Sequence, residues 1–295
     1  MAGYLEKSEN CQHVRSNSLP ARSHPATSTI EEELNKLKAW EELSTSSLKA
    51  ETICVGLSDL GDVYECVKDL LNLPFTQQAL FQFQDQKWVS EVLDTSVKLL
   101  DVCGTTRDLL LQMKQSVQDL QSGLRRRKGE ESSLQSCIDA FISARKKMKK
   151  DIVKGLDILK QMENKFGSSP HMVLEDHLSI IARVLKEVSA ITISIFHSLL
   201  SFMSVPMSKR KPSRCSKEMV VCEVNQKNEV ESVDAAIHVI SKSISRKDAD
   251  VEKVQTAKAR LKSLEVSIED LDSGLECMFG HLVRIRVTLL NILTP

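Results

Sequence analysis

The sequence is poor in the residues that build β-sheets and the turns between strands. Aromatic residues make up only 4% of its 295 positions, and there are just 10 glycines and 7 prolines. Sheets draw on aromatic and β-branched side chains with frequent turn residues between them. Leu, Ile, Val, Lys, Glu and Ser dominate instead, so the composition favours an all-α fold.

The chain also lacks a net charge, because 40 basic residues balance 40 acidic ones. No overall electric field therefore favours a nucleic acid or an anionic membrane, and either partner would need a local basic patch. Proteins that bind nucleic acids commonly place aromatic side chains among the basic ones. The basic runs of this chain contain none, so we expect no nucleic-acid binding.

Eight cysteines are present, but none forms a C-x-x-C pair or a regular disulfide framework. The first ten residues include Glu6, Lys7 and Glu9 and have no apolar core, unlike a secretory signal. We therefore expect reduced thiols and a cytoplasmic location. Cys215 and Cys222 are too far apart for a zinc knuckle and have no histidine between them, so neither a metal nor another cofactor is expected.

Signatures of catalysis are missing as well. The sequence has no phosphate-cradling glycine loop, no nucleophile elbow and no set of kinase motifs. His171, Glu175 and His177 come nearest to a metal or acid–base cluster, but their spacing matches no two-histidine helical motif. We interpret them as exposed residues at a turn and expect a protein that is not an enzyme.

One long segment carries the clearest pattern in the chain. Eleven uncharged positions follow one another at steps of three and four residues, as on one face of a helix. Three further leucines widen this face beyond a two-stranded coiled-coil seam, as a helix in a bundle requires. The segment predicts a helix over 85–127, roughly 65 Å long at 1.5 Å per residue. The eleven positions are Val89, Val92, Ser96, Leu99, Cys103, Thr106, Leu110, Met113, Val117, Leu120 and Leu124.

The same spacing recurs over 30–71, 134–166, 174–202 and 230–292, the last with a break near 245–248. Thr29 with Glu32 forms a capping box that starts the first helix, Pro74 is expected to end the second, and Ser169 with Pro170 to start the fifth. Because long helices joined by short turns pack antiparallel, we expect one elongated antiparallel bundle of about five or six helices over 29–295. It is preceded by a disordered tail, 1–28, and contains a flexible linker near 205–228.

The tail contains a phosphorylation motif. Arg15-Ser16-Asn17-Ser18-Leu19-Pro20 fits the pattern R-S-x-S-x-P, whose second serine 14-3-3 proteins bind once it is phosphorylated. Arg15 suits a basophilic kinase, Ser18 would carry the phosphate, and Pro20 would turn the chain out of the groove. The alternative is a plain solvated tail, because such short patterns also arise by chance.

Three basic clusters are candidates for contact with phosphates, lipid headgroups or an importin. The first lies in the last turn of a predicted helix, where cations offset exposed carbonyls, and the second is mostly a solvated face. The third follows an uncharged segment, 188–207, that is long enough to raise the question of a membrane span. The clusters are Arg125, Arg126, Arg127 and Lys128; Arg145, Lys146, Lys147, Lys149 and Lys150; and Lys209, Arg210 and Lys211.

Within that uncharged segment, Ser194, His197, Ser198, Ser201 and Ser204 fall three or four residues apart on one stripe. The segment is therefore amphipathic, which favours a helix of the bundle. A peripheral membrane or trafficking protein that uses the 188–211 region remains the alternative to a scaffold.

Several segments, in order along nearly the whole chain, resemble the plant-specific BYPASS-type family, whose biochemical function is unknown. The resemblance implies a plant protein linked to root and shoot development, with no active site to carry over. Ala21, where many relatives have Ser, and Gly280, where a basic residue is common, depart from the family pattern. Our interpretation is a non-enzymatic scaffold or adaptor with a phosphorylated tail. The matching segments are 13–25, 99–104, 124–129, 274–277 and 286–293.

Overall fold

The computed structural model describes residues 25–44, 48–126, 131–167, 176–204, 228–245 and 251–294. Within these ranges the chain is almost entirely helical and has no strand. The helices are α1 (Pro25–Ser44), α2 (Ala50–Leu71), α3 (Pro74–Gln82), α4 (Lys87–Arg125), α5 (Glu131–Gly167), α6 (Asp176–Ser204), α8 (Glu229–Ser245) and α9 (Val251–Leu293).

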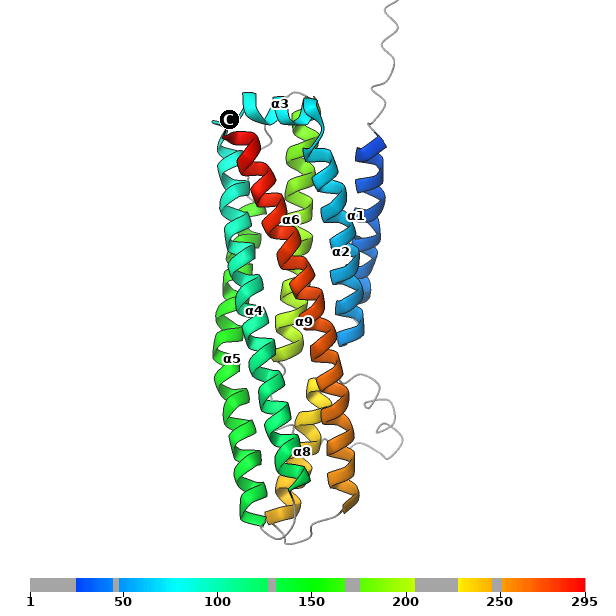
Figure 1. The fold of residues 1–295 in the computed structure, drawn as a ribbon, viewed down its shortest axis with the longest axis vertical. Coiled ribbons are helices and arrows are strands. Elements are labelled where there is room, and N and C mark those ends of the chain that lie inside the picture. The colour runs from blue at the N-terminus through cyan, green and yellow to red at the C-terminus, as the bar shows by residue number, and fades with distance from the viewer. Residues whose placement is uncertain are drawn as a thin grey trace, which may run out of the picture.

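These helices form an elongated bundle (Figure 1). Helices α4, α5 and α9 run along most of its length, α2 and α6 pack beside them in one half, and α8 lies in the other half. Helix α1 covers α2 on the outside, and the short α3 crosses one end. The all-α class and the elongated bundle predicted from the sequence are thus confirmed.

The apolar stripe of α4 faces the core, as its spacing predicts. Each of its eleven positions is buried or half-buried, and Leu110 is fully buried. Helix α4 has 39 residues, which gives a length of about 58 Å at 1.5 Å per residue.

Ion pairs along the outer edge of the contact between α4 and α9 are consistent with one register of the two helices. Arg107 Nε lies 2.9 Å from Asp272 Oδ1, and Arg107 Nη2 lies 3.0 Å from Glu276 Oε2. Two turns along α4, Lys114 Nζ lies 3.1 Å from Glu269 Oε1. Because residues seven apart share one helix face, a shift of either helix would separate several pairs together.

Two prolines begin helices that were not expected to start there. The first helix begins at Pro25, ahead of the start predicted at Thr29, which is wrong. Helix α2 ends before Pro74, as predicted, at Leu71 with Asn72 as its C-cap, but Pro74 then begins α3. In both cases proline occupies the first helical position, where its missing N–H costs no helical hydrogen bond.

The described residues contain eight helices, compared with the expected five or six. Helix α3 was not predicted, because its nine residues are too few to show a periodic pattern. Helices α8 and α9 were predicted as one helix with a break, and that break separates two elements. Most of the tail, 1–28, most of the linker near 205–228, and the start expected at Ser169 and Pro170 lie outside the described residues.

The N-terminus of α8 lies beside the C-terminus of α6 in space, and a buried polar side chain joins the two. Asn228 Nδ2 donates to the carbonyl oxygen of Phe202 at 3.3 Å, while Asn228 Oδ1 accepts from the backbone N–H of Glu231 at 2.8 Å. Asn228 therefore satisfies a carbonyl at the C-terminus of α6 and caps the N-terminus of α8.

Candidate functional site

Most residues of the predicted sites lie outside the part of the chain that the structure describes. This applies to the phosphorylation motif, to half of the first basic cluster and to the whole of the third. The hypotheses built on them remain predictions. The residues are Arg15, Ser16, Ser18, Pro20, Arg127, Lys128, Lys209, Arg210 and Lys211, together with His171 and Glu175 and the side chain of His177.

Arg125 and Arg126 are described, and both are exposed at the end of α4. Arg125 Nη2 donates to Gln121 Oε1 at 3.3 Å, and Arg126 Nε donates to the backbone oxygen of Ser122 at 3.4 Å. Both cations lie at the C-terminus of a helix, as expected from the sequence, and Arg126 contacts one of the backbone carbonyls there.

Arg145 differs from the rest of its basic cluster. Lys146, Lys147 and Lys149 are exposed, whereas Arg145 is buried. Its Nη1 donates to the carbonyl oxygen of Met203 at 3.0 Å, and its Nη2 lies 3.3 Å from Asp234 Oδ2. Arg145 thus joins α5 to α6 and α8 and is not part of the solvated face.

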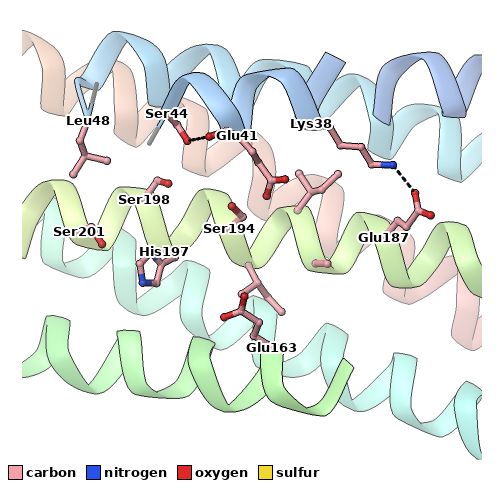
Figure 2. A pocket seen from close by; sticks show the side chains of 13 residues that line it. Lys38, Glu41, Ser44, Leu48, Glu163, Glu187, Ser194, His197, Ser198 and Ser201 are labelled. Carbon is pink, nitrogen blue, oxygen red and sulfur yellow. Dashed lines mark hydrogen bonds and ion pairs between the residues drawn. The ribbon is translucent and has the colours of Figure 1, made fainter. Parts of the chain in front are cut away.

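The polar stripe of α6 lines a groove of about 850 Å³ between α1, α5 and α6 (Figure 2). Ser194, His197, Ser198 and Ser201 reach it from α6 at the spacing seen in the sequence. His197 is exposed and the three serines are half-buried. The groove therefore has hydroxyl groups on its floor, each able to donate and to accept a hydrogen bond.

The opposite face of α6 packs in the core of the bundle. Ile195, Phe196, Leu199 and Phe202 are all fully buried, so the apolar side chains that make the segment amphipathic pack inside the bundle. None of the helices in the described ranges has an apolar stretch long enough to cross a membrane.

The walls of the groove carry charge. Lys38, Glu41 and Ser44 come from α1, and Glu163 comes from α5 (Figure 2). Lys38 Nζ lies 3.5 Å from Glu187 Oε2 of α6 and so bridges the groove near one end. Further along, Ser44 Oγ donates to the backbone oxygen of Glu41 at 2.9 Å, near the C-terminus of α1.

Two carboxylates of the groove remain unneutralised. Within the described ranges, no cationic side chain lies within ion-pair distance of Glu41 or Glu163. With one lysine and three glutamates, the lining is acidic overall. Hydroxyl donors and free carboxylates together suit a polar segment that carries a basic side chain.

A second pocket, of about 470 Å³, lies between α4 and α5 and is closed on one side by Leu200 of α6. Its lining mixes acidic and basic side chains, among them Asp101, Asp151 and Lys154. Asp151 and Lys154 form an ion pair at 2.9 Å, and the lining has more lysines than aspartates, so this pocket lacks the acidic excess of the groove.

One group of reactive side chains was missed by the sequence analysis. Cys277 and His281 lie one turn apart on α9, and Glu65 of α2 lies next to the histidine. The spacing of Cys277 and His281 is visible in the sequence. Glu65 is more than 200 residues away, and only the packing of α2 on α9 brings it to the histidine.

Comparison with known proteins identifies the family. A family model described as Protein BPS1 matches residues 56–292, which is well over half of the chain and includes every described helix beyond the first turns of α2. Helix α1, which forms one wall of the groove, precedes the matched range. The comparisons found no matching curated protein and no matching solved structure. The chain belongs to the Protein BPS1 family, the BYPASS family identified by resemblance from its sequence.

Proposed function

We propose that this protein is a non-enzymatic helical scaffold or adaptor of the cytoplasm that acts in plant root and shoot development. The observation that carries the proposal is the acidic groove between α1, α5 and α6. The developmental part rests on the family alone.

The groove suits an extended segment of a partner protein. Its floor presents the hydroxyls of Ser194, Ser198 and Ser201 in a row along α6 (Figure 2), which fits a backbone that donates and accepts hydrogen bonds at regular intervals. Glu41 and Glu163 provide carboxylates for a lysine or an arginine of that segment, and charge-assisted hydrogen bonds of this kind are the stronger ones.

The N-terminal tail is the second binding element of the proposal. Phosphorylation of Ser18 adds a charge of about −1.5 to −2, which an arginine-lined 14-3-3 groove would recognise, with Arg15 and Ser16 upstream and Pro20 downstream. One partner on the groove and another on the tail would make the protein an adaptor.

The experiment is a quantitative pull-down from plant extract with the full-length protein, with and without phosphatase. The groove variant is Glu41→Gln with Glu163→Gln, and the tail variant is Ser18→Ala. Asp139→Asn is the matched control, because Asp139 is an exposed carboxylate on α5 far from Glu163.

We expect two separable sets of partners, one lost in the groove variant and one lost with Ser18→Ala or phosphatase, with Asp139→Asn retaining both. Partners that bind all variants equally would contradict the proposal. Flotation of the protein with anionic liposomes in the absence of any partner would favour the peripheral membrane alternative, which now depends on the basic residues near 205–211.

A further inference from the structure

Cys277, His281 and Glu65 form a chain of side chains across the contact between α2 and α9, which we call the Cys277 relay. Cys277 Sγ lies 3.4 Å from His281 Nε2, and His281 Nδ1 lies 3.4 Å from Glu65 Oε1. The side chain of His281 is only 11% exposed, whereas Cys277 is exposed. Cys277 therefore lies at the surface with the largely buried His281 behind it, and the Glu65 side chain is 41% exposed.

Neighbouring side chains fix both supporting groups. The ring of Tyr64 stacks on the imidazole of His281, with centroids 6.3 Å apart and planes at 27°, and the Tyr64 hydroxyl lies 2.9 Å from Thr192 Oγ1. Lys68 Nζ contacts Glu65 Oε2 at 2.6 Å, and Arg284 also pairs with Glu65. The relay is therefore preorganised.

Burial keeps the imidazole of His281 neutral near pH 7. Burial lowers the pKa of His281, and the cations Arg284 of α9 and Lys68 of α2 lower it further, while Glu65 and Asp62 of α2 act in the opposite direction. Glu65 faces Nδ1, so it favours the tautomer with the proton on that nitrogen. The lone pair of Nε2 is then free to accept the proton of the Cys277 thiol.

This arrangement is one of a nucleophile, a base and an orienting group, not of a metal site. The sulfur and the carboxylate face opposite nitrogens of one imidazole ring, so they cannot bind the same ion. A thiol next to a positioned base is a reactive thiol, because the thiolate is the nucleophile.

We propose that Cys277 is a base-assisted nucleophilic thiol that a small peroxide oxidises to the sulfenic acid. A small oxidant is indicated because Cys277 is an exposed residue and lines neither the groove of α1, α5 and α6 nor the pocket between α4 and α5. A bulky electrophile would need such a pocket for binding. This modification site is independent of the proposed scaffold function, since it uses neither the groove nor the tail.

The reaction balances with hydrogen peroxide as the only co-reactant. His281 Nε2 takes the thiol proton, and the sulfur attacks one peroxide oxygen, so that the S–O bond forms as the O–O bond breaks. The leaving hydroxide takes the proton from the imidazolium and departs as water. Sulfur loses two electrons and the peroxide gains two, and Glu65 stabilises the transient imidazolium.

The test treats the reduced full-length protein with hydrogen peroxide and a 1,3-diketone that traps sulfenic acids, and follows labelling of Cys277 by peptide mass spectrometry. We expect His281→Gln to slow labelling of Cys277 by roughly tenfold or more and Glu65→Gln to slow it less. His238→Gln replaces an exposed histidine of α8 and should leave the rate unchanged.

A pH profile of the parent protein needs no variant. The rate should level off above the pKa of His281, which lies below the usual 6.5. In His281→Gln, which has no base beside the sulfur, this levelling should be absent. Equal rates in parent and His281→Gln, or the same pH profile in both, would show an ordinary exposed thiol and overturn the proposal.

Discussion

Glu265 accepts hydrogen bonds from three side chains in the contact between α4 and α9. Gln118 Nε2 donates to it at 3.0 Å, Gln121 Nε2 at 3.3 Å and Lys262 Nζ at 3.0 Å. The hydrogen bond from Gln118, followed by that from Lys262, lowers the pKa of Glu265 to about 2. The ionised form is therefore stabilised in the folded protein.

This pKa predicts how Glu265→Gln depends on pH. The folded pKa lies below the ordinary value of 4.5, so the carboxylate stabilises the fold above pH 4.5, and the contribution is lost as the pH falls towards 2. We expect the variant to lose about 1–2 kcal/mol of unfolding free energy at pH 7. Urea unfolding should show this difference shrinking between pH 5 and pH 3.

Glu269→Gln is the control, because Glu269 is half exposed and pairs with Lys114 on the surface. Surface pairs of this kind contribute about 0–1 kcal/mol. A loss in Glu265→Gln that stays constant from pH 7 to pH 3 would contradict the assignment.

The burial of Arg145 could not be predicted from the sequence. Five basic residues crowd the segment 145–150, and nothing in their order distinguishes the first from the others. Arg145 is buried because Asp234 of α8 and the end of α6 meet it there. Its partner lies 89 residues away, so only the packed fold identifies it.

At the scale of elements, α1 is held on α2 by a close approach of Trp40 to Gly56. A Cβ atom at position 56 would lie 2.4 Å from Trp40 Cε2. The indole N–H also donates to the backbone oxygen of Thr52 at 2.6 Å, which fixes the ring above the glycine. Only a residue without a side chain allows this contact.

We therefore expect Gly56→Ala to destabilise the protein by about 1–3 kcal/mol through overpacking and to increase hydrogen exchange over α1 first. Gly104→Ala is the matched control, because no atom lies within 4 Å of a Cβ placed there. In the middle of α4 it should stabilise the protein by about 0.5–1 kcal/mol. Effects of the same sign in the two variants would contradict this packing.

The apolar stripe of α4 predicts that substitutions at two adjacent leucines differ in their effect on stability. Leu110 is fully buried, whereas Leu111 is 45% exposed. Leu110→Asp would bury an unpaired carboxylate and should cost about 4 kcal/mol or more, while Leu111→Asp should change stability by less than about 1 kcal/mol. Thermal melting of both variants measures the difference, and comparable melting temperatures would mean that α4 faces the core with another side.

Long helices were predictable because their apolar spacing continues over many turns, as in α4 and α9. Helix α3 was not predictable, because it has only nine residues and begins at a proline, a residue that is also common shortly after the end of a helix. Pro25 and Pro74 show the same ambiguity. Proline is disfavoured in the interior of a helix. The packing of the neighbouring residues then decides whether the helix lies before or after the proline.

At the scale of the whole molecule, the groove combines α1, α5 and α6, three segments that lie far apart in the sequence (Figure 2). The hydroxyl stripe of α6 could be read from its spacing. That Glu41 and Glu163 face this stripe could not, because it depends on α1 lying over α2 and on α5 returning beside α6. The sequence therefore located the polar face of α6, but it did not predict the site that this face lines.

The central claim is that the bundle is a stable scaffold to which a phosphorylated tail adds a partner without changing the fold. The most direct measurement is a calorimetric titration of a plant 14-3-3 protein with the full-length chain phosphorylated at Ser18. We expect micromolar or tighter binding, no binding by the unphosphorylated chain or by Ser18→Ala, and the same melting temperature for all three chains. No binding by the phosphorylated chain, or a melting temperature that changes with the phosphate, would contradict the account.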